Sequence, residues 1–133
     1  MYKRVFIAED DEDDFLLFRD ALQEYASELK ITRAVDGIEL LEQLEDAGRP
    51  PDIIFMDINM PRMNGIECLR ELRSRPGFDN VPVVVMSTTI SPEMQKQLKK
   101  SKDLFFSKPN SYTDFRNRLH ELVTHYVLGN DTA

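Results

Sequence analysis

At its centre the chain reads Pro51-Asp52-Ile53-Ile54-Phe55-Met56-Asp57-Ile58-Asn59-Met60-Pro61, an apolar run that ends on a carboxylate. The four residues before Asp57 show no alternation of polar and apolar types, so we expect a strand that is buried on both faces. Such strands lie in the centre of parallel sheets whose two faces are covered by helices. Asp57 would then stand at the carboxyl end of the strand, where open α/β sheets bind their ligands. From this stretch alone, an aspartate that caps or turns the chain is an equally good interpretation.

Strand-like and helix-like patterns alternate along the rest of the chain. Apolar runs predict further strands at residues 5–8, 31–35, 81–86 and 104–107. Apolar side chains spaced by three and four predict helices at residues 15–29, 40–47, 66–72 and 115–126. A cap at Ser91 and a first-turn proline at Pro92 predict one more helix at 91–101, which has few apolar side chains. Asn64 with Glu67, and Ser111 with Asp114, predict capped starts for two of these helices. Five strand–helix units predict a three-layer α/β domain, a doubly wound (βα)5 fold with a parallel five-stranded sheet.

The chain of 133 residues has the length of one domain, and it is acidic. Its 24 acidic and 17 basic residues give a formal net charge of −7. This balance argues against nucleic acid or a membrane surface as a partner. The first residues show no signal-peptide pattern and no apolar run approaches about 18 residues, so we expect a cytoplasmic protein. Cys68, the only cysteine, lies in a helical stripe and is predicted to be a small core residue.

Side chains with functional potential follow four of the predicted strands. Glu9 and Asp10 come after the first strand, Asp57 after the third, Ser87 after the fourth and Lys108 after the fifth. Because the carboxyl ends of parallel strands share one edge of the sheet, we expect these side chains to converge. Taken singly, the first two acids also fit helix capping and surface charge, and the lysine fits a solvated position. Their joint placement favours a site.

Three carboxylates at one point require a cation or protons. At about 4 Å, two like charges repel by up to about 4 kcal/mol at an effective dielectric constant near 20. Oxygen ligands without histidine or thiolate indicate Mg²⁺. A carboxylate beside Mg²⁺ and a lysine is suited to attack phosphorus. Asp57 is therefore predicted to accept a phosphoryl group, with Lys108 and Ser87 contacting that group.

Together these residues resemble the receiver domain of two-component response regulators. The resemblance rests on Glu9-Asp10-Asp11, on Asp57-Ile58-Asn59-Met60-Pro61 with Met63-Asn64-Gly65, on Ser87 and on Lys108-Pro109. It covers nearly the whole chain and implies a flavodoxin-like fold of the CheY type. We therefore expect a receiver domain over residues 1–128 and a flexible tail over 129–133. We expect no output domain of its own, because nothing after Leu128 could fold separately.

The resemblance implies a role for each site residue. Asp57 would be phosphorylated by a sensor histidine kinase or a phosphotransfer protein, with Mg²⁺ as cofactor. The implied Mg²⁺ ligands are Asp10, Asp57 and the backbone carbonyl of Asn59, with Glu9 assisting through water. The implied contacts of the phosphoryl group are Lys108 and Ser87. The protein would be no enzyme beyond catalysing its own phosphorylation and dephosphorylation.

The resemblance also implies a switch that controls binding to a downstream protein. Phe105 stands where the family has an aromatic side chain that turns inward after the hydroxyl residue, here Ser87. Thr88 is bulkier than the alanine that many relatives have at its position. The face formed by the helix at 91–101, the strand of Phe105 and the last helix would bind the target, and a homodimer through this face is possible.

Three other classes of protein use a similar arrangement. A phosphatase of the haloacid dehalogenase type has a second aspartate two residues after its nucleophile, where this chain has Asn59. A flavodoxin-like cofactor carrier needs a phosphate-binding loop after the first strand, and the acids of residues 9–14 would repel a phosphate. A scaffold that works without phosphorylation would be expected to lack Asp57 or Lys108, and both are present.

Overall fold

The structure, a computed structural model, describes residues 3–87, 91–99, 104–109 and 111–128. It contains a five-stranded, fully parallel sheet with the strand order β2-β1-β3-β4-β5. The strands are β1 (Lys3–Ala8), β2 (Leu29–Ala34), β3 (Ile53–Asp57), β4 (Val83–Ser87) and β5 (Leu104–Ser107). The order reverses between β1 and β3, which confirms the predicted doubly wound topology.

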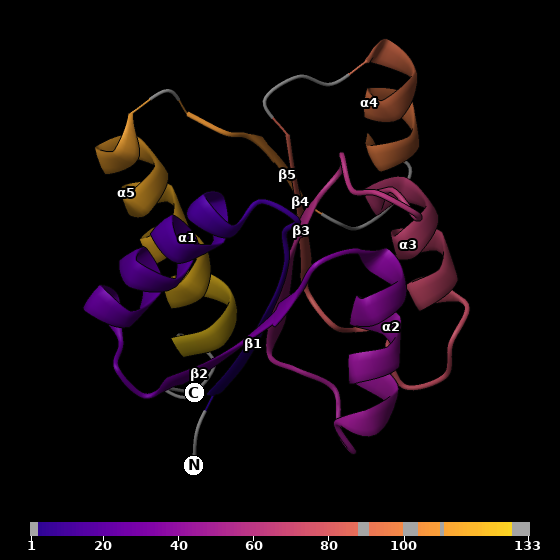
Figure 1. Ribbon diagram of the computed structural model, residues 1–133, viewed down its shortest axis with the longest axis horizontal. Helices are drawn as coiled ribbons and strands as arrows, with labels where there is room; N and C mark the ends of the chain where they lie inside the picture. Colours follow the sequence, from indigo (N-terminus) through magenta and orange to yellow (C-terminus); the bar gives the residue numbers. More distant parts are fainter. Residues whose placement is uncertain (1–2, 88–90, 100–103, 110, 129–133) are drawn as a thin grey trace.

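Helices cover both faces of the sheet (Figure 1). The helices are α1 (Glu12–Tyr25), α2 (Gly37–Asp46), α3 (Gly65–Arg73), α4 (Pro92–Lys99) and α5 (Tyr112–Val123), followed by one π-helical turn, η1 (Thr124–Leu128). The helices α1 and α5 lie on one side of the sheet, and α2, α3 and α4 lie on the other. The predicted three-layer α/β architecture is confirmed.

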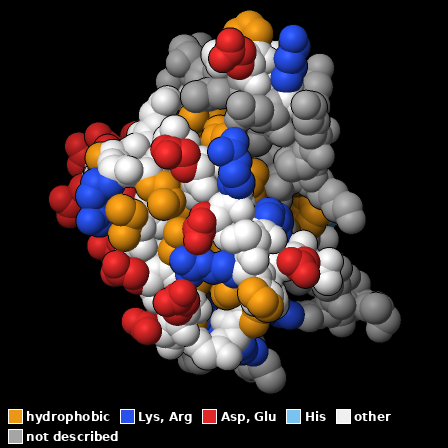
Figure 2. Space-filling view, turned by 90° about the vertical axis from the view of Figure 1, so that its right-hand side faces the viewer, with side chains coloured by type: hydrophobic (Ala, Val, Ile, Leu, Met, Phe, Trp, Pro, Cys, Tyr) orange, Lys and Arg blue, Asp and Glu red, His pale blue; other side chains and the backbone are white. Residues whose placement is uncertain are grey.

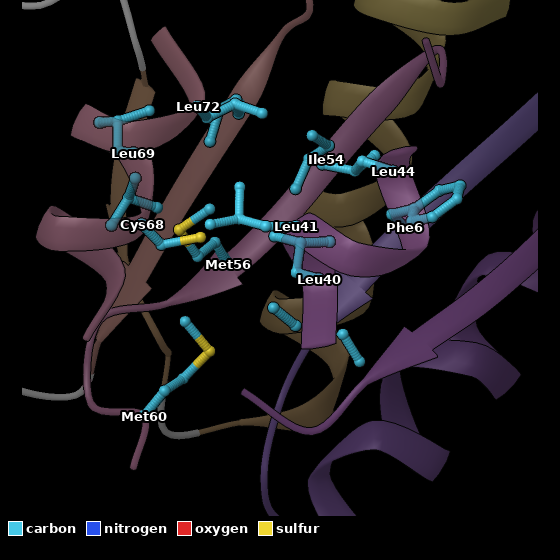
Figure 3. Packing of buried hydrophobic residues seen from close by; sticks show 14 of the residues in the cluster. Phe6, Leu40, Leu41, Leu44, Ile54, Met56, Met60, Cys68, Leu69 and Leu72 are labelled. Atoms are coloured by element: carbon cyan, nitrogen blue, oxygen red, sulfur yellow. The ribbon is translucent and has the colours of Figure 1, made fainter. Parts of the chain in front are cut away.

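The central strand β3 is buried along its whole length, as its unbroken apolar pattern predicts. Successive side chains of a strand point to opposite faces. Accordingly, Ile54 and Met56 pack with residues of α2 and α3, such as Leu40 and Leu72 (Figure 3). The alternate residues of β3 pack on the other face with α1 and α5. Two apolar cores therefore hold β3 in place, and the end of this strand is fixed from both sides.

Helix starts are capped by side chains with the predicted chemistry. Asn64 and Glu67 form a reciprocal capping box at α3, each side chain accepting from the backbone N–H of the other. The Ser111 hydroxyl accepts from the backbone N–H of Asp114 at the start of α5. Asp11 and Asp36 cap α1 and α2 in the same way. Each cap satisfies an N–H group that the helix itself leaves without a partner.

Several predicted boundaries differ from the structure by a few residues, and the end of the first helix and the start of the fourth strand have clear physical reasons. The stripe predicted to extend the first helix to Leu29 is interrupted, because α1 ends at Tyr25 and Ala26 is extended, with φ −147°. Leu29 instead opens β2, where it is buried. The strand predicted from residue 81 begins at Val83, after Pro82, whose nitrogen has no hydrogen to donate to a strand ladder. Thr88, the tail at 129–133 and the end of the predicted helix at 91–101 lie outside the described residues.

Figure 2 shows the side of the molecule that carries α2, α3 and α4. Acidic and basic side chains are interspersed there, so this view shows no field of a single sign. None of the described helices is long and apolar enough to cross a membrane.

Candidate functional site

Four strands deliver polar side chains to the carboxyl edge of the sheet, toward the top of Figure 1. The hydrogen bonds of the sheet continue for one residue past β1, β3 and β5 and fix these positions. The Glu9 N–H donates to the Ala34 carbonyl at 2.9 Å, and the Lys108 N–H donates to the Ser87 carbonyl at 2.9 Å. Asp57 stands opposite Met86 in the pairing of β3 with β4. The backbone pairing of the sheet therefore determines where these residues lie, independently of the contacts between their side chains.

Three carboxylates meet at this edge, as the sequence predicts. Glu9, Asp10 and Asp57 each offer one oxygen, and the three oxygens lie within 4.8 Å of one another. Glu9 and Asp57 are buried, whereas Asp10 is exposed. Hard oxygen ligands at this spacing, with an open side toward solvent, fit a divalent cation that keeps part of its water shell. The residues present therefore fit the predicted Mg²⁺ ion.

Lys108 lies against the same carboxylates. Its Nζ is 2.9 Å from Glu9 Oε1 and 3.1 Å from Asp57 Oδ2, and Asp14 Oδ2 lies farther away at 3.7 Å. Burial alone would lower the pKa of Lys108, but the hydrogen bonds and charges of Glu9 and Asp57 outweigh it and raise that pKa. The ammonium group is therefore charged, and it offsets part of the repulsion among the acids.

Glu9 is the carboxyl group whose ionisation is most disturbed by its surroundings. Its side chain is only 1% exposed. Burial raises its pKa to about 7, while the hydrogen bond and the charge of Lys108 oppose the shift. Near neutral pH this carboxyl is therefore partly protonated, chiefly because it is buried, with a smaller contribution from the negative charge of Asp57.

The two oxygens of Asp57 have different partners. Oδ1 accepts from the backbone N–H of Asn59 at 2.9 Å, and Oδ2 accepts from Lys108. The side-chain amide of Asn59 donates to the buried hydroxyl of Ser87 at 3.1 Å. Asn59 thus links the predicted phosphoacceptor to the predicted switch hydroxyl. The sequence predicts a role only for the Asn59 backbone carbonyl as a metal ligand, and that role remains a prediction.

Phe105, the predicted aromatic switch, lies on β5 opposite Val85. It is half-buried and packs against the apolar cluster on the α2 and α3 face of the sheet. Ser87 is fully buried at the end of the neighbouring strand. The two predicted switch residues therefore stand on adjacent strands.

The loop from β3 to α3 is held by contacts that the sequence analysis missed. Arg62 has φ 63°, a left-handed conformation, and its Nε donates to the buried carboxylate of Asp36 at 2.7 Å. This hydrogen bond holds the pKa of Asp36 below its usual range despite burial. At the end of the loop, a Cβ on Gly65 would lie 2.8 Å from Ile58 Cα and 2.9 Å from the Asp57 carbonyl oxygen. The glycine of the Met63-Asn64-Gly65 motif was the one signal for this close approach.

A small cavity of about 250 Å³ opens beside Lys108, between α1 and the start of α5. Its walls include Leu17, Phe18, Tyr112 and Phe115. Leu17 and Tyr112 are 47% and 40% exposed, which is high for large apolar side chains. The site is therefore bordered by an apolar surface on its α1 and α5 side.

Comparison with known proteins gives consistent matches over most of the chain. The model of the response regulator receiver domain matches residues 5–120. The Regulator of RpoS from Escherichia coli K12 is 36% identical over 124 residues, which cover 91% of this chain and 34% of that protein. The polar-differentiation response regulator DivK from Brucella ovis is 29% identical over 116 residues, or 86% of this chain and 91% of DivK. The chain thus spans about a third of the length of the Regulator of RpoS.

Solved structures share the fold. The phosphorylated cyanobacterial phytochrome response regulator RcpA superposes with a TM-score of 0.87 at 24% identity, covering 96% of this chain and 95% of RcpA. The Mn²⁺-bound form of response regulator Rcp1 gives a TM-score of 0.83 at 20% identity, with 94% of each chain covered.

Proposed function

The chain belongs to the family of response regulator receiver domains, and we propose that Asp57 accepts a phosphoryl group from a histidine kinase or a phosphotransfer protein. The observation that carries this proposal is Lys108, whose ammonium joins Asp57 to Glu9 beside the cluster of three carboxylates. Members of this family are signalling proteins, and the proposed chemistry is limited to phosphorylation and dephosphorylation of the chain itself.

The transfer is an attack of one Asp57 carboxylate oxygen on phosphorus. A P–O bond forms, the bond from phosphorus to the donor nitrogen or oxygen breaks, and the leaving group keeps the electron pair. Asp10, Asp57 and the Asn59 carbonyl would hold Mg²⁺, with Glu9 assisting through water, and the bound ion would offset the negative charge on the phosphoryl oxygens. The raised pKa of Glu9 means that cation binding is accompanied by proton release near neutral pH.

Lys108 changes partner during this reaction. In the unphosphorylated chain its ammonium contacts the carboxylates of Glu9 and Asp57. Once Asp57 carries the phosphoryl group, that side chain becomes an acyl phosphate whose charge lies on the phosphoryl oxygens. We expect Lys108 to follow the charge and donate to one of those oxygens.

Ser87 passes the change to the rest of the molecule. Its hydroxyl would turn from the Asn59 amide to a phosphoryl oxygen, leaving space beside β4 into which Phe105 turns. Moving a two-state equilibrium from 1:99 to 99:1 requires roughly 5.5 kcal/mol, and hydrogen bonds to charged groups contribute about 1.5–3 kcal/mol each. New bonds from Ser87 and Lys108 would therefore supply a large part of the switching free energy.

The face of α4, β5 and α5 would carry the output, by binding a downstream protein or a second copy of the chain. Phe105 and Tyr112 lie on two of these elements, half-buried and exposed respectively. A phosphatase reaction is less well supported, because the residue two positions after Asp57 is an amide that already donates to Ser87.

The decisive experiment is phosphorylation of the purified chain with acetyl phosphate and Mg²⁺, followed by intact mass. The parent should gain one phosphoryl group, chelation of the metal should prevent the gain, and Asp57→Asn should abolish it. Asp13→Asn, which removes an exposed acid from the first turn of α1, is the matched control and should be labelled like the parent. Equal labelling of Asp57→Asn and the parent would refute the assignment.

A further inference from the structure

Arg33, a half-buried residue of the edge strand β2, lies behind the acidic loop of the site. Its Nε donates to the Glu9 carbonyl at 3.2 Å, and its Nη2 donates to the Asp10 carbonyl at 3.1 Å. Its guanidinium also lies over the ring of Phe15, 5.3 Å from the ring centroid. One side chain therefore joins the loop after β1 to the first turns of α1.

The loop that Arg33 holds is short and carries the acids of the site. It runs from the end of β1 at Ala8 to the start of α1 at Glu12. At the start of the loop, the Glu9 N–H donates to the Ala34 carbonyl of β2. At its end, the Asp11 side chain caps α1 by accepting from the Asp14 N–H. The carbonyls of Glu9 and Asp10 lie between these two anchors, and the fork of Arg33 supplies both with a donor.

The acids of residues 9–14 repel one another and favour a loop that spreads apart. The positive charge of Arg33 offsets part of this repulsion, and the guanidinium lies against the main-chain oxygens of the loop. Both of its hydrogen bonds go to carbonyl oxygens, so neither occupies a carboxylate oxygen of Glu9 or Asp10. Lys108 differs in this respect, because it binds the carboxylates directly.

We propose that Arg33 is a positioning residue for the cation site, because it binds the backbone carbonyls of Glu9 and Asp10, the two residues whose carboxylates cluster with that of Asp57. This inference rests on the proposed function, since it assumes that the three carboxylates bind Mg²⁺. The arginine acts through the loop and touches neither the cation nor the phosphoryl group.

Two physical effects of Arg33 oppose each other and can be separated. Its charge near the site repels a cation, so a purely electrostatic role predicts tighter Mg²⁺ binding when the charge is removed. Its planar fork orders the loop, so a positioning role predicts weaker binding. Arg33→Lys keeps the charge but cannot donate to both carbonyls in the same plane or stack on Phe15 in the same way. Arg33→Gln removes the charge as well.

The test is Mg²⁺ titration of the full chain by calorimetry, with Mn²⁺ binding followed by electron paramagnetic resonance. We expect both variants to bind the metal about tenfold more weakly, at the lower end of the effect of outer-shell partners. The Mg²⁺ concentration for half-maximal labelling by acetyl phosphate should rise by the same factor. The labelling rate at saturating Mg²⁺ should equal that of the parent, because only the binding of the cation is affected.

Arg4→Gln is the matched control. Arg4 also lies on a strand, donates to a main-chain carbonyl, that of Arg49 at 3.1 Å, and stacks on an aromatic ring, 5.6 Å from the centroid of Phe6. Arg4 is the second residue of β1 and lies at the amino end of the strand, away from the carboxyl edge, so this variant should leave Mg²⁺ affinity unchanged. Phe15→Leu removes the ring beneath Arg33 and should weaken binding by a smaller factor, which decides the case if both Arg33 variants fail to fold.

Parent-like or tighter Mg²⁺ binding in both Arg33 variants would overturn the inference. Parent-like Mg²⁺ binding in Arg33→Lys alone would also overturn the inference, because a positive charge without the two-pronged guanidinium would then be enough to maintain the cation site. A parent chain that binds no Mg²⁺ and is not labelled would instead refute the proposed function. Mg²⁺ binding and labelling of the parent chain therefore distinguish failure of the proposed function from failure of the inference about Arg33.

Discussion

At the scale of single residues, Glu9 combines deep burial with a carboxylate neighbour and a lysine. The lysine favours the ionised form, and burial together with Asp57 favours the protonated form. Burial prevails, because the pKa of Glu9 is raised to about 7. A folded state that binds a proton more tightly than the unfolded chain loses stability as the pH rises through the interval between the two pKa values.

We therefore predict that Glu9 makes the metal-free protein less stable at pH 8 than at pH 5. The folded pKa is about 7 and the ordinary value is 4.5, so the loss falls between these two pH values. The contribution of this one group should be roughly 1–3 kcal/mol. Glu9→Gln should remove it, so that the difference in unfolding free energy between variant and parent grows with pH. Urea unfolding at several pH values in the presence of a chelator measures that difference.

Glu12→Gln is the control for this prediction, because Glu12 is an exposed acid in the first turn of α1. Its stability curve should stay parallel to that of the parent. If the curve of Glu9→Gln is also parallel to the parent between pH 5 and pH 8, the titration of Glu9 does not contribute to folding.

The sequence predicts which residues meet at the site but not how they bond. Asp57 and Lys108 meet because Asp57 ends β3 and Lys108 follows β5, and the strand order places both at the carboxyl edge, on either side of β4. The contact of the Asn59 amide with Ser87 depends instead on a side-chain rotamer in a loop. The ion pair of Arg62 with Asp36 depends on a left-handed backbone that favours glycine, so an arginine there gives no local signal.

At the scale of elements, Gly65 couples helix α3 to the end of strand β3. Its N–H donates to the Ile58 carbonyl at 2.8 Å, which bonds the start of α3 to the residue that follows Asp57. Helix propensity alone would favour alanine over glycine by about 1 kcal/mol. The added Cβ would however approach two backbone atoms to less than 3 Å, so α3 or the end of β3 must move.

We predict that Gly65→Ala destabilises the protein by about 1–3 kcal/mol, as overpacking typically does. It should also slow phosphorylation of Asp57, since the carbonyl of that residue is one of the displaced atoms. Urea unfolding and the rate of labelling by acetyl phosphate measure the two effects. Unchanged stability with unchanged labelling would show that the loop absorbs the methyl group without moving Asp57.

Gly48→Ala is the control for Gly65→Ala, because it introduces backbone strain away from the site. Gly48 has φ 80°, and an added Cβ would meet open space. This variant should lose about 1–2 kcal/mol through its left-handed backbone alone. Its rate of labelling should equal that of the parent, because the residue follows α2, at the edge of the sheet away from Asp57.

The type of each element follows from the apolar pattern, but its ends do not. Leu29 lies four residues after Tyr25 and so fits the stripe of α1, yet it opens β2. A leucine fits either periodicity, and the extended backbone of Ala26 that ends the helix has no strong local signal. The π-helical turn after α5 was missed for a related reason, because its apolar spacing resembles that of an ordinary helix.

At the scale of the whole molecule, the net charge of −7 is unevenly placed. Six acids are consecutive in residues 9–14, next to the carboxyl edge of the sheet. The side with α2 and α3 shows interspersed charges instead (Figure 2). Folding therefore concentrates repulsion at one edge, where a bound cation would relieve it, and metal binding should stabilise the entire domain.

We predict that Mg²⁺ raises the melting temperature of the protein. A ligand that binds only the folded state at a hundred times its Kd adds about 2.7 kcal/mol. Each kcal/mol corresponds to about 2–8 °C for domains near this size. Asp10→Asn should lose most of the rise, because Asp10 supplies one of the three clustered oxygens. Asp13→Asn should keep it, and NaCl of equal ionic strength should not reproduce it. Equal Mg²⁺-dependent shifts in Asp10→Asn and the parent would mean that the stabilising cation binds elsewhere.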